Sequence, residues 1–363
     1  MELKGIKQQY KIHKTEIDSA IWDVLDNADF INGSQVKQIE TKLAEYVNIK
    51  HCITCANGTD ALQIALMTWN IGKGDAVFVP DFTFFSSGEV VLLQGATPIF
   101  VDIDEKTYNI SSESLERAIQ YVIEKTDLKP RVVVAVDLFG MPFDFEQIKQ
   151  LADKYNLFIL EDAAQGFGSR IGQKKACSFG DISTTSFFPA KPLGCYGDGG
   201  AIFTDNDEWA ELIRSYCVHG KGNDKYDNVR VGMNSRLDTL QAAVLLEKLK
   251  FFDEEIRKCN QVAEEYSKQL HGKVKIPVVK EGIVSSWAQY TICFKSKKER
   301  ENAAEILKQK SVPTAIYYKK PMHLQKAFRE YRFMDLNFDI TEKICDGCLS
   351  LPMHSYLEQE DIE

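Results

Sequence analysis

The chain has 363 residues, of which 44% are hydrophobic and 27% charged, as in a globular protein with one large domain and a smaller one. The formal net charge of -9 provides no basic surface for a nucleic-acid backbone, which argues against DNA or RNA binding. Residues 1–10 lack the apolar centre of a signal peptide, and no apolar run is long enough to span a bilayer. The sequence therefore predicts a cytoplasmic protein without nucleic-acid or membrane partners.

Helices and strands are predicted to alternate through the first two-thirds of the chain. Apolar residues at three- and four-residue spacing predict helices over 14–28, 35–47, 59–69, 112–125 and 144–155. Short apolar runs predict strands over 52–55, 76–80, 98–101, 132–136, 158–160, 182–187 and 201–204. Buried strands that alternate with helices are typical of an α/β fold with a mainly parallel central sheet covered by helices on both faces.

The last third has a different pattern. A long helical region is predicted over 236–270, then strands over 274–279 and 288–294 and a helix over 299–309. This order favours a smaller α+β domain with an antiparallel sheet. We expect the large domain, with its N-terminal helices, to cover residues 1–250 and the smaller domain to cover 251–363.

Nine cysteines raise the question of a metal site or disulfides. Cys52 with Cys55, and Cys345 with Cys348, have the two-residue spacing of a zinc half-site. However, the pairs are far apart in sequence, and neither has a histidine at ligand spacing. We expect free thiols in a reducing compartment and no bound metal.

Four local features carry chemistry, and the first two follow predicted strands. Gly58 and Thr59 stand at a helix start, where free backbone N–H groups and a hydroxyl can bind an anion; a simple helix cap by Asn57 is the alternative. Asp162 comes at the carboxyl end of a buried strand, where open α/β sheets bind ligands, although it could also be an ordinary cap.

The third feature is Lys191, five residues after Ser186 in an apolar, proline-flanked stretch. A lone lysine is usually solvated, but an apolar environment lowers the lysine pKa, as Schiff-base chemistry requires. The fourth feature is a polar stretch that includes Asn234 and Arg236 at the predicted start of the long helix, where a simple cap is again the alternative.

Together these features resemble the DegT/DnrJ/EryC1/StrS family of nucleotide-sugar aminotransferases, which are fold type I enzymes dependent on pyridoxal 5'-phosphate (PLP). The resemblance covers essentially the whole chain, and residues 186–194 with 197–201 carry its most specific part. In that part the chain is similar to family members that aminate UDP-2-acetamido-2-deoxy-3-oxo-glucuronate for bacterial surface polysaccharides. The implied partners are L-glutamate as amino donor and a nucleotide-linked keto sugar as acceptor.

The resemblance also implies roles for individual residues. Lys191 would hold PLP covalently and move the proton between the cofactor and the substrate carbon. Asp162 would keep the pyridine nitrogen protonated, so that the ring acts as an electron sink. The other implied cofactor contacts are Gln165 near the phenolic oxygen, Phe84 stacked on the ring, and Gly58, Thr59, Ser186 and Asn234 at the phosphate. Asn234 would come from the neighbouring subunit, which implies a homodimer with shared active sites.

The substrate side departs from the family pattern. The family's His-Tyr-Pro segment is replaced by residues 317–321, so that only Tyr318 and, less directly, His323 carry over as substrate-binding residues. Arg236, at a predicted helix start, and Lys319 and Lys320 carry positive charges that suit an acidic sugar; for the two lysines, ordinary solvated side chains are the alternative. The chain ends inside what resembles a terminal helix, which is compatible with a truncated C-terminus.

Other functions fit the sequence less well. A related PLP sugar dehydratase would have histidine where Lys191 stands. A PLP-sensing transcription factor would need a basic N-terminal module, for which the 50 residues before the sheet leave no room. A non-catalytic sugar-binding protein would not explain why Asp162, Ser186 and Lys191 occur together. Within the aminotransferases, a 3-oxo or 4-oxo 6-deoxy sugar remains an alternative acceptor.

Overall fold

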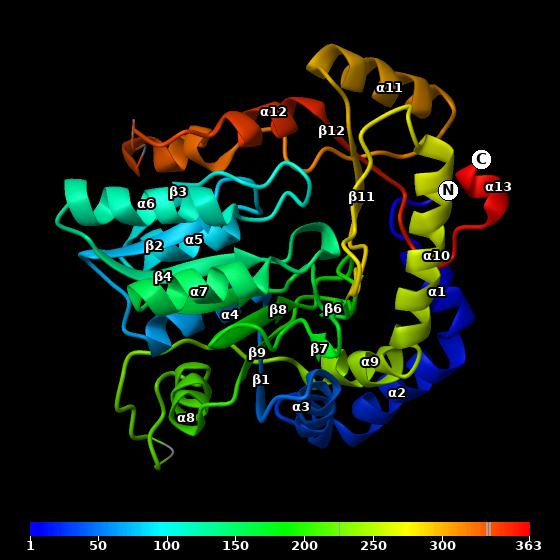
Figure 1. The fold of residues 1–363 in the computed structure, drawn as a ribbon. Helices are drawn as coiled ribbons and strands as arrows, with labels where there is room; N and C mark the ends of the chain where they lie inside the picture. The colour runs from blue at the N-terminus through cyan, green and yellow to red at the C-terminus, as the bar shows by residue number, and fades with distance from the viewer. Residues whose placement is uncertain (225, 332, 334) are drawn as a thin grey trace.

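The computed structural model describes residues 1–224, 226–331, 333 and 335–363. Within this part of the chain, the central sheet has seven strands in the order β1-β9-β8-β5-β4-β2-β3 (Figure 1). Their bounds are β1 His51–Cys55, β2 Asp75–Pro80, β3 Thr97–Val101, β4 Lys129–Val136, β5 Phe158–Asp162, β8 Ile182–Ser186 and β9 Gly200–Thr204. β9 pairs antiparallel with β1 and β8, whereas the other neighbouring strands are parallel. The predicted mainly parallel sheet is confirmed.

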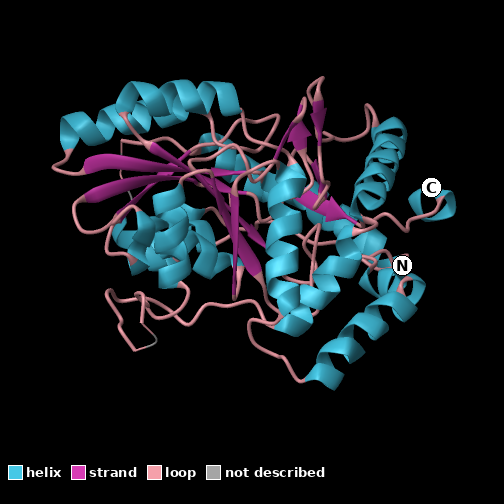
Figure 2. Cartoon of the chain, turned by 90° about the horizontal axis from the view of Figure 1, so that it is seen from below, coloured by secondary structure: helices cyan, strands magenta, loops and turns pink. Residues whose placement is uncertain are grey.

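Helices cover both faces of this sheet, as Figure 2 shows from a second direction. One face packs against α3 Ser34–Val47, α6 Ser112–Lys125, α7 Phe145–Tyr155, α9 Thr239–Leu249 and α10 Phe252–Leu270. The other face packs against α4 Gly58–Thr68, α5 Ser86–Leu93, α8 Asp207–Tyr216 and α12 Asp339–Gly347. Successive strand residues alternate between the faces, so that Phe78 joins the first core while Val77 and Val79 join the second. Because both faces are buried, most of the strands are apolar runs, which is why their positions could be predicted; β8 is the exception, with buried Ser and Thr side chains.

The long helix predicted over 236–270 is wrong in two respects, and the first is that the chain forms two helices. α9 ends at Leu249, and α10 begins at Phe252 after a turn through Lys250. The turn brings Phe252, which is 1% exposed, into the core on the sheet face. The segment before Thr239 is also extended rather than helical, and Asp238 forms an isolated bridge with Ile31. Packing against the rest of the protein therefore overrides the local helical pattern.

The C-terminal third contains a small antiparallel sheet of β11 Tyr290–Cys293 and β12 Cys348–Leu351. Its core includes α10 residues Val262 and Tyr266, and α11 Lys297–Gln309 packs against it. The strand predicted over 274–279 is wrong, since only Lys275 forms a bridge there, and Pro277 has no N–H for a ladder. The proposed division at residue 250 stays a prediction, because α10 contributes to both cores.

Three further α-helices and three short strands lie in the described part of the chain. They are α1 Ile6–Ile12, α2 Lys14–Asn27, β6 Arg170–Ile171, β7 Lys174–Lys175, β10 Ile283–Val284 and α13 Gln359–Ile362. The two ends of the chain lie close together beside α10 (Figure 1). None of the helices in the described residues is long and apolar enough to cross a bilayer. All nine cysteines are free thiols, and eight of them are buried.

Candidate active site

A cavity of about 480 Å³ lies at the carboxyl ends of β2, β5 and β8 and beside the start of α4. Eight of the predicted site residues line it, namely Gly58, Thr59, Phe84, Asp162, Gln165, Ser186, Lys191 and Tyr318. They come from five parts of the chain, and the sheet brings those that follow β1, β2, β5 and β8 to one edge, where Tyr318 joins them.

Asp162 is the last residue of β5 and is only 6% exposed. Its carboxylate accepts hydrogen bonds from the Ser87 hydroxyl at 2.8 Å and the Ala164 N–H at 3.2 Å. Burial raises the pKa of Asp162, while the Ser87 hydrogen bond and the charge of Lys191 lower it. A cation that entered the cavity would therefore stabilise a carboxylate that the protein alone solvates poorly.

Lys191 lies in the loop between β8 and β9, where its backbone N–H donates to the Phe188 carbonyl at 2.8 Å. Burial lowers the pKa of the Lys191 amine, and the negative charge of Asp162 acts in the opposite direction. The site thus places a desolvated amine and a buried carboxylate on the same cavity. An amine with a lowered pKa is neutral more often, which makes it both a nucleophile and a proton acceptor.

An anion-binding cradle lies at the start of α4. Asn57 caps the helix by accepting from the Asp60 N–H at 2.8 Å, so that the cap and the predicted anion site occur at the same turn. A Cβ at Gly58 would lie 2.7 Å from the Cβ of Ser186, which only a glycine avoids. The hydroxyls of Thr59 and Ser86 are 3.0 Å apart, and Thr59, Ser86 and Ser186 all line the cavity. Free N–H groups at a helix start with nearby hydroxyls suit a phosphate.

Aromatic and amide side chains complete the wall. Gln165 accepts from the Phe139 N–H at 2.8 Å and donates to the Tyr318 hydroxyl at 3.2 Å. The Phe84 ring is 53% exposed, and its centroid is 6.4 Å from that of Tyr318. Gln165 and Tyr318 are thereby fixed by each other, whereas the Phe84 ring is accessible to a planar ligand.

Three predicted site residues are not among the described residues that line this cavity. Asn234 is exposed and forms an isolated antiparallel β-bridge with Val218. Arg236 lies in the extended segment before α9, so its predicted place at a helix start is wrong; its Nε is buried without a hydrogen-bond partner. His323 is buried, with Nδ1 2.6 Å from a carboxylate oxygen of Asp81.

His323 is also held on its other side. Its Nε2 lies 3.2 Å from the Glu342 carboxylate, and its ring stacks on Phe338 with centroids 4.3 Å apart. In this single subunit its contacts are therefore structural. Lys319 and Lys320 are exposed and outside the cavity wall. Binding of a substrate by His323, Arg236, Lys319 or Lys320 stays a prediction.

Several residues of the site were missed by the sequence analysis. Ser87 follows β2, the strand beside β4, and the rule that parallel strands end at one edge could have placed it near Asp162. Tyr317, next to the predicted Tyr318, also lines the cavity. Gln289 and Lys4 line it as well, but both are distant in sequence from the other site residues, and no local pattern indicated them.

The residues present fit PLP. Gly58 leaves room at the cradle for a phosphate, and the cradle, Asp162 and Lys191 all border one cavity. Asp162 offers a carboxylate to a protonated ring nitrogen, and Lys191 offers the amine that would hold the aldehyde carbon. The 480 Å³ cavity is within the range of small-molecule sites.

Comparisons with known proteins agree with this geometry. The model of the DegT/DnrJ/EryC1/StrS aminotransferase family matches residues 11–363. The UDP-2-acetamido-2-deoxy-3-oxo-D-glucuronate aminotransferase of Pseudomonas aeruginosa is 42% identical over 364 aligned residues, which cover 100% of this chain and 98% of that protein.

Solved structures give the same result. A DegT DnrJ EryC1 StrS aminotransferase from Brucella abortus has a TM-score of 0.97 and 44% identity, covering 100% of this chain and 96% of that one. NtdA from Bacillus subtilis, solved with its bound cofactor PMP, has a TM-score of 0.87 and 30% identity, covering 96% of this chain and 79% of that one.

Proposed function

Because this chain belongs to the DegT/DnrJ/EryC1/StrS family of PLP-dependent sugar aminotransferases, we propose that it moves the amino group of L-glutamate to UDP-2-acetamido-2-deoxy-3-oxo-glucuronate. PLP is its cofactor. The proposed setting is the cytoplasmic synthesis of a bacterial surface polysaccharide. The proposal rests on the full-length similarity to the Pseudomonas aeruginosa enzyme. It is supported by the cavity that both Lys191 and Asp162 line.

Lys191 and Asp162 have complementary roles in this proposal. When bound, PLP supplies an electron sink for the electrons released as the substrate carbon loses its proton. Asp162 holds a proton at the ring nitrogen, and its burial strengthens that interaction by excluding water. The Lys191 amine would hold the cofactor covalently and, as a free amine, would move the proton between the substrate carbon and C4′ of the cofactor. A lowered pKa suits Lys191 to both directions of this transfer.

The rest of the wall binds and orients. The N–H groups at the start of α4, with the hydroxyls of Thr59 and Ser186, would hold the phosphate. Gln165 would lie near the phenolic oxygen, and the exposed Phe84 ring would cover one face of the pyridine. These contacts would fix the ring so that protons are transferred at the side facing Lys191.

The substrate proposal is tested with a panel of keto nucleotide sugars and glutamate as the donor. We expect fastest amination of the 3-oxo-glucuronate, with the new amine at C3 by NMR. A neutral 4-oxo-6-deoxy sugar is the matched alternative, because it lacks the carboxylate. Strong turnover of that sugar, with none of the 3-oxo-glucuronate, would refute the acceptor and leave the aminotransferase assignment intact.

We also propose a homodimer in which Asn234 reaches the phosphate site of the partner subunit. Asn234 is exposed, and the same connection carries Val229 and Val231, which are 53% and 88% exposed. Trp22 and Ile31 are exposed by 61% and 49%. Exposed apolar side chains in such number favour a protein interface.

Subunit mixing tests this arrangement. Lys191→Ala and Asn234→Ala proteins are expected to be inactive and weakened respectively as homodimers. A mixed dimer would have one site with both substitutions and one with neither, so activity should rise above that of either parent after co-refolding. The control is a mixture without refolding, and mass spectrometry confirms subunit exchange. No gain despite exchange would place Asn234 outside the partner's site.

A further inference from the structure

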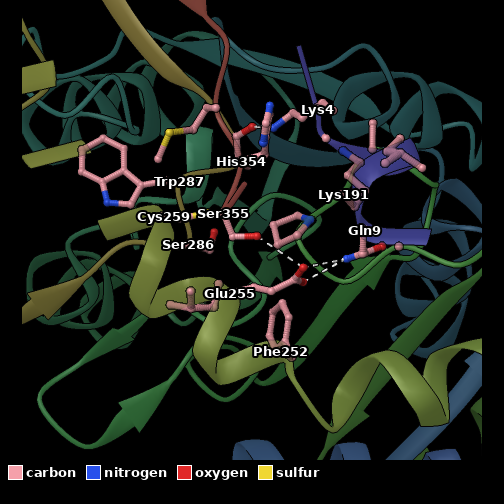
Figure 3. A pocket seen from close by; sticks show the side chains of 18 of the residues that line it. Lys4, Gln9, Lys191, Phe252, Glu255, Cys259, Ser286, Trp287, His354 and Ser355 are labelled. Carbon is pink, nitrogen blue, oxygen red and sulfur yellow. Dashed lines mark hydrogen bonds between the residues drawn. The ribbon is translucent and has the colours of Figure 1, made fainter. Parts of the chain in front are cut away.

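The segment before α1 lies beside the segment after β12, and it places Lys4 in the wall of the active-site cavity. The Met353 N–H donates to the Leu3 carbonyl at 3.1 Å, and His354 Nε2 lies 3.2 Å from the Glu2 carbonyl. A Cβ at Gly5 would be 2.6 Å from the His354 ring, so the two segments are in close contact. These contacts hold the backbone on both sides of Lys4, and Figure 3 shows Lys4 beside His354.

Lys4 lies at the junction of two cavities. The first is the 480 Å³ active-site cavity, and the second, of about 80 Å³, is lined by residues 189–192 of the loop that carries Lys191; Figure 3 shows this second cavity. Lys4, Ala190 and Lys191 line both. The Lys4 amine donates a hydrogen bond to the Ala288 carbonyl, one residue before Gln289 of the active-site wall. A second amine is therefore built into the site beside Lys191.

The Lys4 amine has no acidic partner within the part of the chain that the structure describes. The neighbouring Glu255 is instead bonded to Gln9, Ser355 and Tyr356. Burial lowers the pKa of Lys4 to about 8, and the charge of Lys191 lowers it as well. Such a cation gains from an anion that enters the cavity, because desolvation strengthens their attraction.

The wall offers few other charges to a substrate. Among the described residues that line the active-site cavity, the cationic side chains are Lys4 and Lys191, and the acidic ones are Asp162 and Asp198. Lys191 attaches the cofactor, which leaves Lys4 as the cation for a substrate. The buried Oε1 of Gln289, on the same wall, lacks a hydrogen-bond partner and would accept from a ligand hydroxyl or N–H.

We propose that Lys4 is a specificity-determining residue that binds a carboxylate of the substrates. This inference rests on the proposed function, in which glutamate and a uronate sugar use the cavity in turn and both carry carboxylates. A single ammonium on a flexible stem can follow carboxylates at somewhat different positions, which a rigid guanidinium fork does less readily. Lys4 thereby favours acidic over neutral substrates without contacting the reacting carbon.

The test replaces Lys4 by methionine, which keeps an unbranched side chain and removes the charge. The probe is glutarate, a dicarboxylate without a reactive amine or ketone, titrated calorimetrically into the holoenzyme. In Lys4→Met we expect the Kd for glutarate to rise ~10- to 100-fold, because one charged hydrogen bond is lost. Lys4→Arg should retain most of the affinity, because it keeps the positive charge. Lys7→Met is the matched control, because Lys7 is exposed on α1 and its ion-pair partner is Glu2 at 3.8 Å.

Half-reactions identify which carboxylate is bound. The glutamate half-reaction is followed by the cofactor absorbance. The second half-reaction is followed in the same way, once with the 3-oxo-glucuronate and once with its neutral 3-oxo-glucose counterpart. If Lys4→Met raises only the KM for glutamate, Lys4 binds the carboxylate of the donor. If Lys4→Met lowers only the rate with the acidic sugar, Lys4 binds the carboxylate of the acceptor. Unchanged glutarate affinity and unchanged half-reactions in Lys4→Met would overturn the inference.

The experiments distinguish an error in the role of Lys4 from an error in the proposed function. If the wild-type enzyme accepts glutamate and the acidic sugar while Lys4→Met behaves identically, only the role of Lys4 is wrong. If the wild-type enzyme accepts neither, the proposed function is wrong. Should Lys4→Met not fold, amine labelling of the wild-type holoenzyme replaces it: glutarate should protect Lys4 and not Lys7, and equal labelling would overturn the inference.

Discussion

Lys191→Ala is expected to lower turnover by about 10⁴-fold, because it removes both the covalent attachment of PLP and the group that transfers the proton. The variant should still fold, since Lys191 makes no side-chain hydrogen bond that the structure records among its described residues. Steady-state kinetics with glutamate and the 3-oxo sugar measure the loss. Circular dichroism of the same preparation separates lost chemistry from lost structure.

The chain provides a stringent control for the site of attachment. Burial lowers the pKa of Lys4 and of Lys248 to about 8, so each is also a reactive amine. Lys4 lines the same cavity as Asp162, whereas Lys248 does not, and Lys191 is the one of the three that lies in the loop directly after β8. Borohydride reduction followed by peptide mapping should place the label on Lys191. A label on Lys4 or Lys248 would contradict the assignment, as would the absence of a chromophore after incubation with PLP.

The sheet and the centre of the site could be predicted because local signals and topology agree. β5 begins with the apolar run Phe158–Leu160, and β8 is buried although four of its five residues carry hydroxyls; the two pair in parallel with Leu160 opposite Ile182. Parallel neighbours end at the same edge, so Asp162 and the loop with Lys191 had to meet there. The same reasoning, applied to β2, would have added Ser87.

Other features depend on packing that no local pattern encodes. The helical periodicity over 236–270 gives no sign of the turn at Lys250, which exists because Phe252 packs on the sheet face. Lys4 belongs to a short polar segment, and it reaches the cavity only because the two chain ends pack together. The place of Asn234 depends on a second subunit, so the sequence of one chain could indicate it only through resemblance.

Asp162→Asn tests the other half of the chemistry, since it removes a charge and keeps the shape. The asparagine can still accept from the Ala164 N–H, and its amide can donate to the Ser87 hydroxyl after that hydroxyl rotates. What is lost is the negative charge that holds the proton at the ring nitrogen. Losing one partner of a buried charge pair costs about 3–5 kcal/mol, so we expect turnover to fall about 10²- to 10⁴-fold.

The same substitution should lower turnover without lowering the stability of the cofactor-free protein, and this difference separates a catalytic role of Asp162 from a structural one. Because burial raises the pKa of Asp162, the cofactor-free folded protein binds a proton there more readily than the unfolded chain. The stability contributed by this group is therefore present at low pH and is lost as the pH rises through the raised pKa. Cofactor-free Asp162→Asn should lack this loss, and at pH 7 its melting temperature should equal or exceed that of the wild type. Near-normal turnover with PLP bound would contradict the electron-sink role, and a marked drop in the melting temperature of the cofactor-free variant would indicate that Asp162 acts mainly in folding.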